Sequence, residues 1–141
     1  FKQKTAYEIV DCDWSSDVCS SDLLNAGRPI DAAQDHRMAP ISCEHAVTSL
    51  IAIAARATGG VYQLSASSDV SYVDLAHRMA EKAGRGRQLV SAKAATDLGI
   101  PANEVMHFTS MDARRASELT GIATPGPFIA IDQTIEGLVA G

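Results

Sequence analysis

Apolar residues recur at helical spacing in several stretches of this chain, and polar or glycine-containing turns separate those stretches. In residues 42–56, Ser42 is placed to cap a helix and Glu44 lies in its first turn. A surface helix buries one stripe of its circumference, so we expect the apolar side of this helix to face the core. That expected inward stripe consists of Ala46, Val47, Leu50, Ile51 and Ala54.

Residues 59–84 predict a strand, a loop and a helix in succession. Residues 61–64 follow a glycine pair and have the apolar character of a buried strand. Ser71, with Asp74 three residues later, forms a capping-box pattern, and Gly84 can adopt the left-handed conformation that ends a helix. The expected inward positions of this helix are Tyr72, Leu75, Ala76, Met79, Ala80 and Ala83.

The rest of the chain continues this mixture of short elements. Gly27 is placed to end a helix that begins upstream of Leu24, and Ser110 is placed to cap a later helix. A last helix begins near Pro127, and its inward stripe consists of Phe128, Ile131, Ile135 and Leu138. The remaining predicted elements are strands at 29–33, 88–91 and 107–109, and helical turns at 93–98. The pattern predicts an α/β fold with short strands and about four helices.

Residues 2–23 do not share this patterning. They show no lasting helical or strand period and are rich in Ser and Asp. Residues 2–8 and 13–22 resemble the translation of a sequencing adapter, in one reading frame and with a gap the size of an index between them. We therefore interpret 1–23 as a non-native, disordered segment and 24–141 as the natural fragment, whose true beginning is missing.

This interpretation changes the charge and cysteine content. The formal net charge of the whole chain is -5, but residues 24–141 carry ten basic and twelve acidic side chains. No basic cluster indicates a nucleic-acid surface, and no apolar run approaches the roughly 20 residues of a membrane span. Cys43 is the one cysteine left in 24–141, so neither a disulfide framework nor a cysteine metal site is expected. We expect a cytoplasmic protein in which Cys43 is a small buried residue.

No complete active site can be assembled from the residues. The sequence has no glycine-rich phosphate loop after a predicted strand and no Tyr followed four residues later by Lys. Two polar positions remain. The first is the loop Asp35, His36, Arg37 and Pro40, where an Arg can bind phosphate, although a solvated turn explains it equally well. The second is His107, for which the simpler explanation is an edge strand.

Four segments also resemble one family: 27–30, 35–41, 60–65 and 70–76 are similar to the C-terminal half of dTDP-4-dehydrorhamnose reductase-like proteins. These are extended short-chain dehydrogenase/reductases, like the NAD-dependent nucleotide-sugar epimerases and dehydratases. The family loop usually reads Asp-Gln-x-Gly-x-Pro-Thr; Asp35 and Pro40 fit, whereas His36, Met38 and Ile41 depart from it. Residues 107–112 resemble the family's Arg-Pro-x-x-x-Leu-Asp without its leading Arg-Pro.

The resemblance implies that 24–141 is an incomplete, C-terminal part of a Rossmann-like fold that binds a nucleotide sugar. Asp35, His36, Arg37, Pro40 and His107 are its expected substrate-binding residues. NAD or NADP would be bound by the other half of such a parent, together with a Tyr/Lys pair. We therefore expect no catalytic, cofactor-binding or metal-binding residue in this chain. The alternatives are a fragment of an epimerase or dehydratase and a non-catalytic α/β ligand-binding module.

Overall fold

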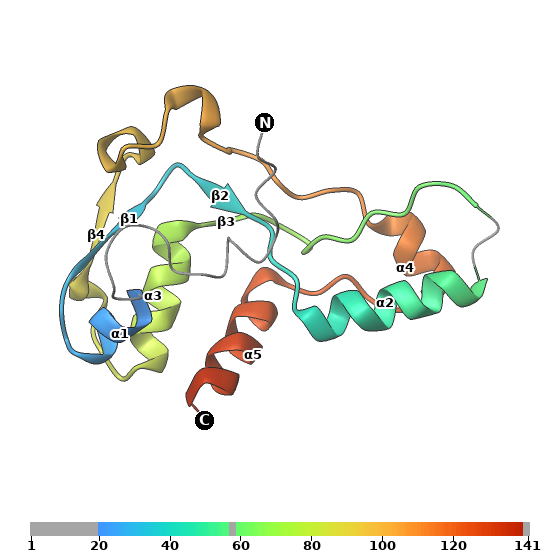
Figure 1. The fold of residues 1–141 in the computed structure, drawn as a ribbon, viewed down its shortest axis with the longest axis horizontal. Coiled ribbons are helices and arrows are strands. Elements are labelled where there is room, and N and C mark those ends of the chain that lie inside the picture. Colours follow the sequence, from blue (N-terminus) through green and yellow to red (C-terminus); the bar gives the residue numbers. More distant parts are fainter. Residues whose placement is uncertain (1–19, 57–58, 140–141) are drawn as a thin grey trace, which may run out of the picture.

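The chain folds into a mixed α/β structure of short elements, seen in a computed structural model that describes residues 20–56 and 59–139 (Figure 1). Two pairs of strands form within these residues. β1 (Ile30–Ala33) pairs in parallel with β4 (Val90–Lys93), with Ile30 opposite Val90. β2 (Arg37–Met38) pairs antiparallel with β3 (Val70–Ser71). The coarse prediction of an α/β fold with short strands is confirmed.

The described residues also form five α-helices, one more than the approximate number expected. Their bounds are α1 (Ser20–Asn25), α2 (Cys43–Arg56), α3 (Tyr72–Lys82), α4 (Arg114–Thr120) and α5 (Pro127–Val139). Three 3-10 helices complete the described elements: η2 (Arg87–Leu89), η3 (Ala95–Leu98) and η4 (Ala102–Glu104). Ser20–Leu23 of α1 belong to the segment interpreted as non-native, and residues 1–19 lie outside the described residues.

The predicted helix ends are largely confirmed, because each depends on residues close in sequence. Ser71 Oγ accepts a hydrogen bond from Asp74 N at 3.1 Å, and Asp74 Oδ2 accepts one from Ser71 N at 3.2 Å. At the other end of α3, Gly84 has φ +67° and allows Arg85 N to reach the carbonyl of Ala80. Gly27 closes α1 in the same left-handed region.

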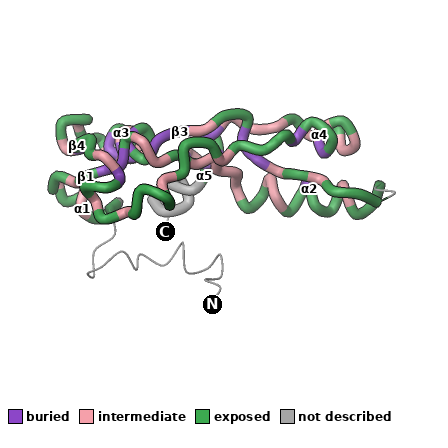
Figure 2. The backbone as a smooth tube through the Cα atoms, turned by 90° about the horizontal axis from the view of Figure 1, so that it is seen from above, coloured by how far each residue is buried: buried purple, intermediate pink, exposed green. Residues whose placement is uncertain are grey.

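The hydrophobic core lies where α1 and α3 pack on the parallel pair β1 and β4. Leu24 and Ala80 are fully buried there, and Figure 2 shows the buried backbone concentrated around α3 and β1. Four further residues complete the cluster: Ala32, Val73, Ala76 and Val90. The expected inward position Tyr72 is instead 36% exposed, because Val73 takes the place facing the core.

The apolar stripe expected to be buried on α2 faces outward. Leu50 is 57% exposed and Ile51 is 66% exposed, whereas Ser49 on the opposite side is 2% exposed. That opposite side packs on α4, so the small polar residue lies in the contact and the large apolar ones do not. Cys43, expected to be buried, is exposed at the start of this helix.

Three predicted strands were wrong or displaced. Residues 61–64 form no strand, since none of the other described strands runs beside them, and Val61 is 75% exposed. The strand expected at 88–91 begins at Val90, where pairing with β1 sets the register. Residues 107–109 also form no strand, because the amide of Thr109 donates to a carboxylate, that of Asp69.

Candidate functional site

The loop that contains most of the predicted site residues is shaped by the pairing of β2 with β3. Arg37 and Met38, expected to lie in a loop, form β2. The carbonyl of His36 accepts a hydrogen bond from Tyr72 N at 3.2 Å. The His36 and Tyr72 rings also lie in contact, with centroids 5.1 Å apart and planes tilted by 38°. His36 is therefore held against the first residue of α3.

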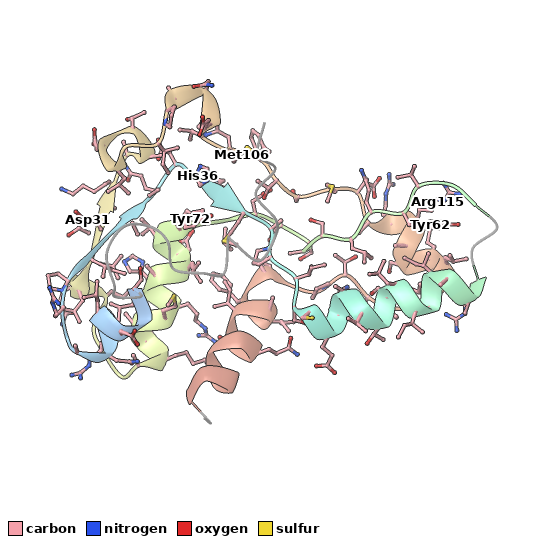
Figure 3. The ribbon with its side chains drawn as sticks, in the orientation of Figure 1. Asp31, His36, Tyr62, Tyr72, Met106 and Arg115 are labelled. Atoms are coloured by element: carbon pink, nitrogen blue, oxygen red, sulfur yellow. The ribbon has the colours of Figure 1, made fainter. Side chains whose placement is uncertain are left out.

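His36 and Arg37 also bind a segment that is seventy residues away in sequence. His36 Nδ1 accepts a hydrogen bond from Met106 N at 3.0 Å, and Arg37 N donates to the Met106 carbonyl at 2.7 Å. Figure 3 shows His36 between Met106 and Tyr72. Because Nδ1 is the acceptor, a neutral His36 carries its proton on Nε2. These two bonds place Met106, the residue before His107, beside the loop.

Asp35 has a structural partner in this arrangement. Its Oδ1 accepts a hydrogen bond from Ala95 N at 2.7 Å, at the start of η3. This bond ties the loop after β1 to the segment after β4. Pro40 is half-buried between β2 and α2 and has no backbone N–H to offer a ligand. Asp35 and Pro40 therefore position the loop, and neither presents a free donor.

Arg37 and His107 are the two predicted residues that remain open to solvent. Both are exposed, and neither side chain makes a hydrogen bond or ion pair with another described residue. A guanidinium can bind a carboxylate or phosphate through two parallel hydrogen bonds, and an imidazole can donate a further one. Each of these two exposed side chains has the chemistry to bind an anion.

Asp69, which the sequence analysis did not single out, holds the segment that follows His107. Its carboxylate accepts hydrogen bonds from the backbone N–H and the hydroxyl of both Thr109 and Ser110, at 2.6 to 3.0 Å. The hydroxyl of Ser110, followed by the Thr109 donors, lowers the pKa of Asp69 from 3.8 to about 2. The predicted cap at Ser110 was wrong, since α4 begins at Arg114 and Ser110 binds Asp69 instead.

A second concave surface, of about 290 Å³, lies between α3 and α5. It is lined by Asp74, His77, Arg78, Glu81, Arg87 and Phe128. Its charged groups are occupied by one another or by neighbours. Arg78 binds both carboxylate oxygens of Asp132 at 2.7 and 2.6 Å, and Arg87 Nε binds Glu81 at 2.7 Å. Arg78 holds the pKa of Asp132 below its ordinary value. These ion pairs hold the walls of the groove together.

A small cavity of about 10 Å³ between α2 and α4 contains a Ser and His pair. Ser49 Oγ lies 3.5 Å from His45 Nε2, and Ser49 is 2% exposed. A volume of this size can hold about one water molecule. Ser42, another hydroxyl near His45, accepts from the His45 backbone N–H as a helix cap. The pair therefore has no space for a substrate.

The described residues do not fit a dinucleotide. Such a site needs a glycine-rich turn between a strand and a helix N-terminus, whereas β1 and β4 are followed by Gln34 and Ala94. Among the described residues, no group of three His, Cys, Asp or Glu side chains gathers to hold a metal ion. None of the described helices has both the length and the apolar character to cross a membrane. Compared with known proteins, the chain matches no family model and no curated protein.

Proposed function

We propose that residues 24–141 are the substrate-binding portion of a cytoplasmic NAD(P)-dependent nucleotide-sugar reductase resembling the dTDP-4-dehydrorhamnose reductases. In this proposal, Arg37 and His107 bind the diphosphate of the nucleotide sugar. The observation that carries the proposal is the pair of hydrogen bonds between Met106 and the loop, which brings together the two segments that carry these exposed side chains. The mixed α/β fold is compatible with such a protein.

A diphosphate suits this surface for electrostatic and geometric reasons. The Arg37 guanidinium has no competing carboxylate among the described residues, so it can offer its donors to a ligand. The nearby Asp35 carboxylate accepts a hydrogen bond from Ala95 N, which offsets part of its repulsion of an anion. His36 is held between Tyr72 and Met106 and positions the loop.

The reaction itself would depend on groups outside this surface. NAD(P) would supply hydride, and the resemblance assigns its binding and the Tyr/Lys pair to the other half of such a protein. The described residues do not fit the cofactor, so we expect this chain to bind substrate without turning it over. A second candidate, a non-catalytic α/β ligand-binding module, is favoured by the closed core around α3.

The test is isothermal titration of the full chain with thymidine diphosphate and, separately, with inorganic pyrophosphate. Arg37→Ala should weaken binding of both by about tenfold or more, since it removes a charge-assisted contact. Arg28→Ala is the matched control, because Arg28 is also exposed and its side chain has no described partner. Equal binding by the Arg37→Ala variant, or no binding by the unchanged chain, contradicts the proposal. If the chain bound NADPH at micromolar concentration, this would contradict the assignment of substrate and cofactor to separate halves of the protein.

A further inference from the structure

Phe108 is 86% exposed, more than any other large apolar side chain whose exposure the structure describes. It lies in segment 105–111, which has no regular secondary structure apart from its bend and runs from the 3-10 helices past β2 and β3 to α4 (Figure 1). An aromatic ring in water forgoes the free energy that burial would provide. An exposed ring of this size is therefore a candidate for contact with a ligand.

The backbone on both sides of Phe108 is fixed. Before it, Met106 is bonded to His36 and Arg37 through both its N–H and its carbonyl. After it, Thr109 and Ser110 donate four hydrogen bonds to Asp69. Phe108 therefore lies in a segment whose backbone is held by hydrogen bonds two residues before it and one residue after it. A ring on a fastened loop can bind a ligand without a large loss of conformational entropy.

The backbone of Phe108 is also close to the backbone of Arg37. The Met106 carbonyl is 2.7 Å from Arg37 N, and two residues of chain span at most about 7 Å. Phe108 is thus within a nucleotide's reach of Arg37 along the backbone. An aromatic face next to a cation suits a ligand that joins a flat ring to a phosphate group.

We infer that Phe108 stacks on the base of a nucleoside diphosphate whose phosphates are bound by Arg37. This inference rests on the proposed function and adds to it the recognition of the base. Counted back from Asp112, Phe108 falls on a position that the family pattern leaves unspecified, so the resemblance assigns it no role. The alternative aromatic wall, Phe128, lies in a groove whose charges are paired with one another.

The experiment compares two probes, thymidine diphosphate and inorganic pyrophosphate, on the full chain by isothermal titration. Phe108→Ala should weaken thymidine diphosphate about tenfold, since stacking on an aromatic side chain contributes free energy of this order, and should leave pyrophosphate binding unchanged. Phe108→Trp should restore binding, because it keeps a stacking face. Phe128→Ala is the control and should bind both probes as the unchanged chain does. Circular dichroism shows that each variant is folded.

The outcomes distinguish a failure of the stacking contact from a failure of the proposed anion site. If Phe108→Ala binds thymidine diphosphate normally while Arg37→Ala does not, the stacking contact is wrong and the anion site stands. An equal loss for both probes in Phe108→Ala also overturns the stacking contact, since pyrophosphate has no base. If the unchanged chain binds neither probe, both the anion site and the stacking contact are wrong. Selective loss of thymidine diphosphate, rescued by Trp, supports the inference.

Discussion

Two leucines, each on a helix with an apolar stripe, have opposite surroundings in this molecule. Leu24 of α1 is fully buried against α3 and the parallel strands, whereas Leu50 of α2 is 57% exposed. We call α1, β1, α3 and β4 the α3 region, and α2 with α4 the α2 region. Figure 2 shows the contrast, with buried backbone gathered in the α3 region and mostly exposed or intermediate backbone along α2.

The difference shows that an apolar stripe is buried only where another element packs against it. In the α3 region, Val73, Ala76 and Ala80 meet a pair of strands and a second helix. In the α2 region, the partner helix α4 presents Ala113 and Ala116 beside Ser49, and these small residues line the contact. We therefore expect most of the free energy of folding to come from the α3 region.

The sharpest test of this comparison is one substitution made in both regions. Leu24→Ala should lower the free energy of unfolding by about 2 to 5 kcal/mol, because it leaves a cavity in the core. Leu50→Ala should change it by less than about 0.5 kcal/mol, because the side chain is already in water. Urea unfolding followed by circular dichroism measures both. Equal losses would mean that the α2 stripe is covered in solution, and the comparison would fail.

A smaller effect should separate the two helix caps. Ser71 exchanges hydrogen bonds with Asp74 in a complete capping box, while Ser42 accepts a single bond from His45 N at 3.2 Å. Ser71→Ala should cost about 1 kcal/mol in unfolding free energy, and Ser42→Ala about half as much. The same urea experiment measures them. A larger loss for Ser42→Ala would place more stability in the α2 region than the burial pattern indicates.

The smallest expected effect concerns the segment that runs between the regions. Asp69 has a pKa of about 2 in the folded chain, against 3.8 when free of its partners. Its lowered pKa stabilises the folded state above about pH 4, and this contribution is lost as the pH falls through 2. Solvent screening keeps the contribution below about 1 kcal/mol.

The measurement is thermal unfolding between pH 2 and pH 7. Asp69→Asn should be slightly less stable than the unchanged chain at pH 7, and the gap should close by pH 2. Asp97→Asn is the control, since the Asp97 side chain makes no hydrogen bond with a described residue. A gap that stays constant across this range would show that the Asp69 charge does not fasten residues 109–110.

The sequence predicted those features whose causes are local. The capping box of Ser71 and Asp74 and the left-handed glycines at 27 and 84 each involve residues a few positions apart. The outward face of α2 could not be predicted, because apolar periodicity marks a stripe without naming the surface that covers it. The strand predicted at 61–64 was wrong for a similar reason, since a strand forms only where a partner strand offers its backbone groups.

The same distinction between local and distant causes applies to the candidate site. Arg37 and His107 were chosen from their residue types and loop positions, and the structure brings their segments together. Asp69 could not have been found, because its partners Thr109 and Ser110 lie forty residues away and nothing near Asp69 marks it. Tyr72 was read as a core position, although its ring contacts His36. Contacts distant in sequence determine which polar residues become neighbours.

The parallel register of β1 and β4 also has a consequence for how the chain folds. Ile30 and Val90 are opposite each other although about sixty residues separate them, so their pairing requires a large loop to close first. Closing such a loop loses much chain entropy before any sheet contact is gained, whereas α3 can begin from its own cap. We expect α3 to acquire structure early and the β1–β4 pair to lock late, which makes this strand pairing the slow step of folding.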